Sequence, residues 1–225
     1  MKRIPWVTAA AILLAAGCTD TGITTSLTGN LRVVNGASSA GPVVVYVDGQ
    51  AVGLAINPGT GSAVDVPTGT HSIELHSAAG AGFSRTTQFD LGKSVIIVGL
   101  DSAGRVTSSV LADTGAIVPA GATKLRVAHM ASAATPISIW RTQPDYGTMI
   151  RVQFPFPYLA VSPYLQSTPG DWRVMVSSET NVAATVPMPD TLADSGVIPV
   201  PTGTSKTVVI VNKVGGGVAV VVVDP

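Results

Sequence analysis

The sequence predicts an all-β protein with two tandem immunoglobulin-like β-sandwich domains, at residues 30–115 and 123–225, behind a signal peptide. Short runs of β-branched residues alternate with Gly, Pro, Asn and Asp turn signals about every 8–12 residues, as in sandwich domains. No window of about ten residues combines helical periodicity with helix caps and freedom from Gly and Pro. A series of blocks in the first half of the chain also recurs in the second half.

The composition narrows the classes of function. Of the 225 residues, 46% are hydrophobic and 12% are charged, with 13 basic against 13 acidic side chains. This hydrophobic fraction is too high for an intrinsically disordered chain. The balanced charge gives no support to nucleic-acid binding, which normally shows a basic excess. Because the chain has one cysteine, it cannot form an internal disulfide.

The first residues have the pattern of a signal peptide, which we place at residues 1–17. Lys2 and Arg3 form a positive region, and a mostly apolar segment runs from Val7 to Ala16. That segment is shorter than the roughly 20 apolar residues that a helix needs to cross a bilayer. The pattern therefore predicts export and not a membrane span.

The residues before the cysteine resemble the lipobox of a bacterial lipoprotein signal. They read Ala15-Ala16-Gly17-Cys18, where the commonest form is Leu-Ala-Gly-Cys. The resemblance implies cleavage between Gly17 and Cys18 and acylation of the Cys18 thiol, so that the chain is bound to a membrane through its lipid anchor. Thr19 favours the outer membrane, and the Thr-rich residues 18–29 are predicted to form a flexible tether. An ordinary secretory signal is the alternative.

An internal repeat occupies the rest of the chain. Leu31–Ser38 is echoed by Leu125–Ser132, 94 residues later, and the same offset relates Tyr46 to Trp140. A period of about 100 residues has the size of a domain, so it indicates a tandem duplication. Three further blocks recur in the same order: Leu54–Pro58 with Leu159–Pro163, Gly69–Ile73 with Gly170–Val174, and Lys93–Val98 with Lys206–Val211.

Local patterns predict individual strands and turns, about six or seven strands in each domain. Val43–Val47 is followed by Asp48-Gly49, a strong hairpin signal. Val95–Leu100 and Val106–Leu111 flank a turn in the same way. The valine-rich run at Val218–Val223 is expected to be soluble only if it is buried on both faces or paired along its edges.

These strand and turn motifs resemble domain-of-unknown-function family 4397. The family pattern Arg-Val-Val-His-Ala-Ser is similar to the block Leu31–Ser38, Val-Tyr-Val-Asp-Gly to Val45–Gly49, and Val-Pro-Ala-Gly-Thr-Tyr to Val66–His71. Leu125–Ser132 matches again in the second half, which lacks the Asp-Gly hairpin. The resemblance implies secreted or lipid-anchored bacterial β-sandwich domains, and it supplies no catalytic residues.

We predict no catalytic constellation, no metal site and no cofactor. The three histidines lack zinc-binding spacings, and no Gly-x-Ser-x-Gly elbow occurs. Glu74 and His76 share a strand face, and together with His129 they support an alternative hypothesis, an envelope metal-dependent or hydrolytic accessory enzyme. His129 stands where the first unit has Asn35, so both side chains are expected to bond a nearby turn.

Aromatic side chains gather in the second unit, where seven of the eleven lie between Trp140 and Trp172. The insert Gln143–Pro157 holds several of them, and a second insert, Asn181–Thr204, is expected to be irregular. Rigid aromatic side chains give contact area at low entropic cost, which favours a binding surface; packing between the two units is the other interpretation. The candidate surface residues are Tyr146, Phe154, Phe156, Tyr158 and Tyr164.

The resulting hypothesis is a non-enzymatic, lipid-anchored protein of the cell envelope that binds or displays something at the envelope surface. An envelope protein or a polysaccharide is the expected partner, and nucleic acid is not. A structural spacer is a further alternative.

Overall fold

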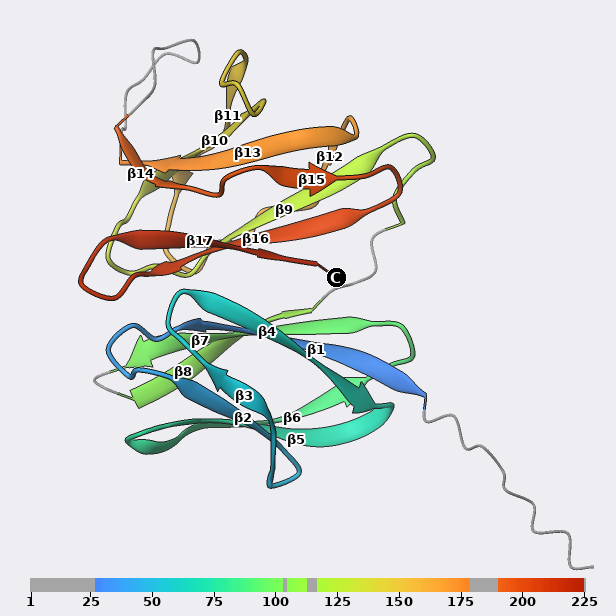
Figure 1. Ribbon diagram of the computed structural model, residues 1–225, viewed down its shortest axis with the longest axis vertical. Coiled ribbons are helices and arrows are strands. Elements are labelled where there is room, and N and C mark those ends of the chain that lie inside the picture. The colour runs from blue at the N-terminus through green and yellow to red at the C-terminus, as the bar shows by residue number, and fades with distance from the viewer. Residues whose placement is uncertain (1–26, 103–104, 113–116, 179–189, 225) are drawn as a thin grey trace, which may run out of the picture.

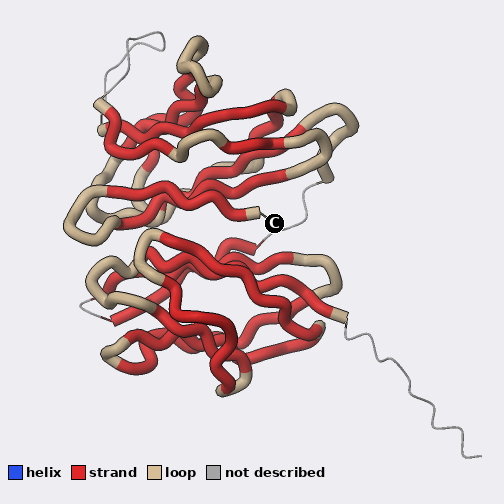
Figure 2. Tube along the Cα trace, viewed as in Figure 1, coloured by secondary structure: helices blue, strands red, loops and turns tan. Residues whose placement is uncertain are grey.

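Strands make up most of the residues that the structure describes, which are 27–102, 105–112, 117–178 and 190–224 of this computed structural model. Within these ranges there are seventeen strands and no helix (Figure 2). None of these residues therefore forms a helix long enough to cross a bilayer. The all-β prediction is confirmed. The predicted signal peptide and its cleavage and lipidation positions, Gly17 and Cys18, lie outside the described residues.

The first eight strands form a sandwich of two four-stranded sheets. The sheets have the orders β4-β1-β7-β8 and β3-β2-β5-β6, and β1 pairs in parallel with β7. Alternate residues of each strand point inward and make the core, with Leu31, Ile73 and Phe89 fully buried. The strands are β1 (Thr28–Gly36), β2 (Val43–Val47), β3 (Gln50–Ile56), β4 (Thr60–Pro67), β5 (Gly69–Ser77), β6 (Gly80–Phe89), β7 (Ser94–Ser102) and β8 (Arg105–Ala112).

The remaining strands form a second sandwich with the same strand order. Its sheets run β12-β9-β16-β17 and β11-β10-β13-β14, with the short β15 also pairing with β13. Three of the four repeated sequence blocks therefore lie in equivalent strands, with β1 matching β9, β5 matching β13 and β7 matching β16. The match of Leu54–Pro58 to Leu159–Pro163 was wrong, because the first block ends β3 whereas the second lies after β11, and strand pairing makes Ile56 equivalent to Phe156. The strands are β9 (Thr123–His129), β10 (Ile137–Thr142), β11 (Met149–Phe156), β12 (Leu165–Ser167), β13 (Gly170–Ser177), β14 (Thr191–Asp194), β15 (Ile198–Val200), β16 (Ser205–Asn212) and β17 (Val218–Val223).

The two sandwiches stack face to face, so that four sheets lie in layers (Figure 1). The sheet that contains β1 and β7 packs its outer face on the sheet that contains β16 and β17. The hydrophobic cluster of this interface is aliphatic apart from one methionine, and a side-chain hydrogen bond between Asp101 and Asn212 also joins the two sandwiches. The buried members of the cluster are Val34, Ile96, Val98, Leu100, Leu111, Ala128, Met130, Val209, Val211, Val221 and Val223.

The stacking explains why the C-terminal strands are so rich in valine. Val208 and Ile210 of β16 face the core of the second sandwich, while Val209 and Val211 face the first sandwich. All four side chains are fully buried. In the run Val218–Val223 itself, which is β17, Val218, Val221 and Val223 are buried and Val220 and Val222 are half-buried, and the strand is paired with β16 along one edge. The approach is close at Gly36, where an added Cβ would lie 2.9 Å from Cγ1 of Val211.

Two expectations about the inserts were wrong. Residues 149–156, expected in an exposed loop, form β11, and part of the segment 181–204 forms β14 and β15, while 181–189 lies outside the described residues. The prolines misled the prediction, because β11 lies at the edge of its sheet, where a missing N–H donor is tolerated. Among the described residues the first sandwich has eight strands and the second has nine, where six or seven were expected in each.

The hairpin predicted at Asp48-Gly49 is confirmed and joins β2 to β3. Both turn residues have positive φ, 50° for Asp48 and 77° for Gly49. Successive positive φ values are those of the type I′ turn, whose twist matches that of the flanking strands. The second sandwich has a longer connection, residues 143–148, in the same place. This connection holds several of the polar contacts described next.

Candidate functional site

The five predicted surface aromatics are not gathered into one patch. Phe156 is only 3% exposed and belongs to the core of the second sandwich. Tyr158 is half-buried with its ring 6.3 Å from that of His129, and Tyr164 lies under the guanidinium of Arg126, at 4.6 Å. None of the five belongs to the hydrophobic cluster between the sandwiches, although burial and the nearby Asp101 of the first sandwich raise the pKa of Tyr158. The prediction of a single aromatic surface was therefore wrong, and of the five only Tyr158 is placed near the other unit.

Tyr146 and Phe154 are associated with the outer face of the sheet β11-β10-β13-β14. Trp140 of β10 points to this face, since its neighbour Ile139 points into the core, and Trp140 is nevertheless fully buried. The guanidinium carbon of Arg151 lies 5.7 Å from the Trp140 ring centre and 5.4 Å from that of Phe154. An arginine is thus held between two aromatic rings on β10 and β11.

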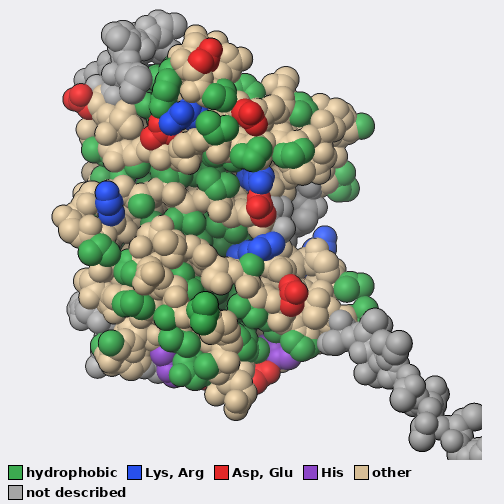
Figure 3. Space-filling model, viewed as in Figure 1, with side chains coloured by type: hydrophobic (Ala, Val, Ile, Leu, Met, Phe, Trp, Pro, Cys, Tyr) green, Lys and Arg blue, Asp and Glu red, His purple; other side chains and the backbone are tan. Residues whose placement is uncertain are grey.

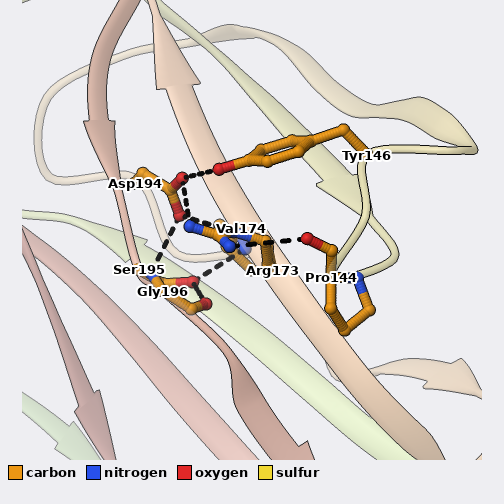
Figure 4. A network of polar contacts seen from close by, with 7 residues as sticks. All are labelled: Pro144, Tyr146, Arg173, Val174, Asp194, Ser195 and Gly196. Atoms are coloured by element: carbon orange, nitrogen blue, oxygen red, sulfur yellow. Dashed lines mark hydrogen bonds and ion pairs between the residues drawn. The ribbon is translucent and has the colours of Figure 1, made fainter.

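A closed network of polar contacts joins three segments beside this face (Figure 4). The guanidinium of Arg173 donates to both carboxylate oxygens of Asp194, at 3.2 and 2.8 Å, and stacks at 4.6 Å on the ring of Tyr146. The Tyr146 hydroxyl donates to the same carboxylate at 2.9 Å. Arg173 also reaches the carbonyl of Pro144 at 3.5 Å. The network therefore fixes the 143–148 connection to β13 and β14.

The charges of this network stabilise one another. Burial opposes ionisation of Asp194, but the hydrogen bonds from Arg173, from the Gly196 backbone and from Tyr146 outweigh it and keep the pKa of Asp194 below its usual value. The bond to the Asp194 carboxylate raises the pKa of Tyr146. It also raises the pKa of Arg173. All three groups keep their ordinary ionisation states at neutral pH, as expected of a structural clamp and not of a proton-transfer site.

A further arginine–aromatic stack lies at the end of the sandwich where β10 ends and β13 begins. The guanidinium of Arg141 lies 4.2 Å from the ring centre of Trp172, and it donates to Oγ of Ser167 at 2.6 Å. Ser167 is on β12, in the opposite sheet, so Arg141 bridges the open end of the sandwich. A cavity of about 460 Å³ lies beside Arg141, and another of about 360 Å³ lies beside Trp172.

A cavity of about 820 Å³ lies between the two sandwiches. Figure 3 shows basic and acidic side chains close together along this boundary. Lys206 pairs with Asp224 across the β16 and β17 ends, and the Asn30 amide donates to Asp65 at 2.9 Å. These acids already have partners, and no aromatic side chain lines the cavity. We regard the end of the second sandwich where Arg141 stacks on Trp172 as the stronger candidate for a binding site.

The histidines do not form a shared site. His76 bonds its strand neighbour Glu74 at 2.8 Å, and His71 bonds Asp48 at 2.6 Å, both in the first sandwich. His129 is fully buried in the second sandwich. Within the described ranges, no three His, Cys, Asp or Glu side chains are placed to hold a metal ion. The alternative that joined Glu74, His76 and His129 in one metal site was therefore wrong.

His129 and Asn35 instead occupy equivalent turn positions. Nδ1 of His129 accepts a hydrogen bond from the Ala131 backbone at 3.4 Å, and Oδ1 of Asn35 accepts one from the Ala37 backbone at 3.0 Å. The prediction that both side chains bond a nearby turn is confirmed. Burial lowers the pKa of His129, so that its neutral form is favoured in the folded protein.

The buried His129 is expected to make the folded state less stable in acid. Its pKa is lower folded than unfolded, so its full contribution is present above the unfolded value of about 6.5 and is lost as pH falls through the folded value. We expect His129→Asn to reduce the loss of Tm between pH 7.5 and pH 5. His76→Asn, at a half-buried position of the first sandwich, is the matched control. An unchanged pH profile in His129→Asn would contradict the assignment.

A comparison with known families identifies the domain. The family described as Domain of unknown function (DUF4397) matches residues 29–140. The chain carries a DUF4397 domain. The match begins with β1 of the first sandwich and ends within β10 of the second. The family resemblance of the sequence motifs is thereby confirmed, and the description of the family includes no enzymatic activity.

No curated protein matches this DUF4397 protein. Among solved structures, the Bacillus anthracis TIE protein is 10% identical with a TM-score of 0.25, covering 82% of this chain and 34% of its own. A leucine-rich repeat protein from Bacteroides thetaiotaomicron is 9% identical with a TM-score of 0.23, covering 81% of this chain and 26% of its own. The DUF4397 protein thus spans about a third or less of these chains, and likeness at this level carries no argument.

The DUF4397 motifs contain residues with structural roles, whereas four residues of the arginine–aromatic stacks lie outside the matched part of the chain. Asn35 and His129 lie in the repeated motif, as does the Asp48-Gly49 turn of the first sandwich. Arg141, Arg151, Trp172 and Arg173 all lie beyond residue 140, where the family match ends. Periodicity could not have paired Arg141 with Trp172 or Arg173 with Tyr146, because these side chains come from different segments of the chain.

Proposed function

We propose that this protein is a lipid-anchored binding protein of the bacterial cell envelope, with its contact surface on the second sandwich. The lipobox-like Ala15-Ala16-Gly17-Cys18 supports the anchor, and the Thr-rich residues 18–29 would set the reach of the folded part from the membrane. The first sandwich would serve as the base on which the second is mounted. The binding is proposed to involve no chemical reaction.

The observation that carries the proposal is an asymmetry between two similar sandwiches. Among the described residues, every stack of an arginine on an aromatic ring lies in the second sandwich. The strand register and the repeat place Val47, Ala51, His71 and Ser72 of the first sandwich where the second has Arg141, Arg151, Trp172 and Arg173. The first sandwich has the same strand order without such stacks, which supports a role for them beyond the strand order itself.

These stacks are suited to binding because both partners are held before a ligand arrives. An aromatic ring presents a large flat area with few rotatable bonds, and a stacked guanidinium still has N–H groups at its edge. Arginine, tyrosine and tryptophan are also the residues that contribute most at binding interfaces. Preorganised side chains of this kind lose little entropy on binding.

The anchor is tested with Cys18→Ala. Without the thiol, we expect the protein to lack the mass of the acyl groups. We also expect a soluble product, uncleaved or mis-cleaved, that no longer needs detergent to leave the membrane fraction. Fractionation and intact mass spectrometry provide the two readouts. A variant that stays in the membrane fraction with unchanged mass would show that the anchor is elsewhere.

Binding by the folded part is tested by cosedimentation with purified envelope fragments. We expect the detergent-solubilised full chain to cosediment with them, and Phe154→Ala to weaken cosedimentation several-fold. Tyr46→Ala, a half-buried aromatic of the first sandwich, is the matched control and should cosediment like the unaltered chain. Equal retention of all three proteins would contradict the placement of the contact surface.

A further inference from the structure

The environment of Arg141 is unusual for a charged side chain. Its guanidinium is half-buried, stacked at 4.2 Å on Trp172, and bonded to the neutral hydroxyl of Ser167 at 2.6 Å. Its Nε is shielded from solvent and has no hydrogen-bond partner. Burial lowers the pKa of Arg141, and no neighbouring carboxylate counteracts this effect.

No carboxylate of the described residues forms an ion pair with Arg141. Arg173, by contrast, donates to both carboxylate oxygens of Asp194 in the same sandwich. A desolvated charge without a counter-charge is costly, and such a group is uncommon unless a ligand or ion completes it. The equivalent residue of the first sandwich is Val47, so the fold itself does not require this charge.

The cavity of about 460 Å³ beside Arg141 has the lining that an anion needs. Besides Arg141, it is lined by Gln166, Ser167 and Thr168, whose side chains can donate hydrogen bonds, and by Gly121 and Ala122. No acidic side chain lines it. The planar guanidinium can donate two parallel hydrogen bonds, which suits the two oxygens of a carboxylate.

A second cavity, of about 360 Å³, adjoins the first through Thr168. Asp145, Asp171 and Gln143 line it together with Trp172. Carboxylates and amides accept and donate hydrogen bonds to hydroxyl groups, and an indole offers apolar contact to a ring. The two cavities therefore pair an anion position with a position where carboxylates can accept hydrogen bonds from hydroxyl groups.

We propose that the two cavities bind a saccharide that carries a carboxylate, with the carboxylate at Arg141 and the sugar hydroxyls at Asp145 and Asp171. The inference rests on the proposed function and names the class of ligand for it. A single negative charge balances the one guanidinium. Free phosphate has no sugar hydroxyl groups and would leave the position beside Asp145, Asp171 and Trp172 unoccupied, so a saccharide accounts for both cavities.

The test measures binding of oligogalacturonate, a chain of uronic acids, to the detergent-solubilised full chain by calorimetry. We expect saturable binding of this probe and none of a neutral dextran of equal length. Arg141→Gln should weaken binding about 10- to 100-fold, the range for loss of a charge-assisted hydrogen bond. Lys213→Gln, which removes an exposed positive charge from the β16–β17 turn of the same sandwich, should leave affinity unchanged. Thermal unfolding of both variants confirms that they are folded.

Three outcomes would overturn the inference: no saturable binding of oligogalacturonate, unchanged binding in Arg141→Gln, or displacement of the probe by equimolar inorganic phosphate. If Arg141→Gln does not fold, Arg141→Lys keeps the charge without the planar fork and should still weaken binding. Cosedimentation with envelope fragments is measured on the same protein. Retention on fragments without oligogalacturonate binding would reject this inference and leave the proposed function standing, whereas loss of both would reject the two together.

Discussion

Val211→Asp is expected to lower the free energy of unfolding by about 3–5 kcal/mol, the cost of an uncompensated charge in a buried site. Val211 is fully buried in the interface between the sandwiches, and Gly36 lies directly against it. The surrounding side chains are aliphatic, so none can pair with the new carboxylate. Denaturation in urea, followed by tryptophan fluorescence, measures the change.

Val214→Asp is the matched control for this prediction. Val214 lies in the turn between β16 and β17 and is 60% exposed, so the same substitution should change stability by no more than about 0.5 kcal/mol. Similar destabilisation by both variants would mean that aspartate harms this strand pair irrespective of burial. A negligible effect of Val211→Asp would mean that the sandwiches separate easily in solution.

Trp140→Ala is the second substitution with a large expected effect, about 3–5 kcal/mol of lost stability. The side chain is fully buried, and its indole N–H donates to Oγ of Ser177 at 2.9 Å. Removing the indole leaves a cavity, leaves Ser177 without its partner, and removes the ring beside Arg151. Thermal unfolding by calorimetry measures the change.

Trp140→Phe separates the parts of this effect. It keeps an aromatic ring and removes the N–H donor, so the expected loss is smaller, about 1 kcal/mol for the hydrogen bond plus a small packing defect. Tyr46→Ala, at the equivalent half-buried position, should cost less than Trp140→Ala. Equal losses of stability at the two positions would contradict the claim that Trp140 is more buried than Tyr46.

The fold was predictable where a pattern depends on one strand or one turn. The repeat placed Leu31–Ser38 and Leu125–Ser132 in equivalent strands, and the valine run correctly indicated a strand that is paired with a neighbour and buried in part. The Asp48-Gly49 pair specified its own hairpin. These features follow from alternation and from the φ values that a turn demands, both of which are local.

The candidate surface was less predictable because it depends on register between strands. Phe154 and Phe156 are two residues apart and would share a face in a regular strand, yet Phe156 is in the core and Phe154 contacts Arg151. The pairing of β10 with β11 shifts register at two places, and such bulges change the face to which later residues point. Nothing in the order of residues along the chain reveals such shifts.

The arginines were missed for a related reason. In the sequence, Arg141, Arg151 and Arg173 look like ordinary surface arginines. Each is recognised as part of a stack only when the fold brings it beside an aromatic ring from another segment. The metal alternative failed in the same way: alternation correctly placed Glu74 and His76 on one face, but a third ligand would have required a tertiary contact that is absent among the described residues.

The stacking of the two sandwiches also bears on the origin of the molecule. The buried contact uses corresponding positions of the two repeats: Val34 matches Ala128, Ile96 matches Val209, and Val98 matches Val211. Use of one patch on both partners is the rule that governs symmetric homodimers. A single ancestral domain with this hydrophobic outer face would have formed a homodimer with a second copy of itself. Fusion of the two genes would then have made the contact permanent.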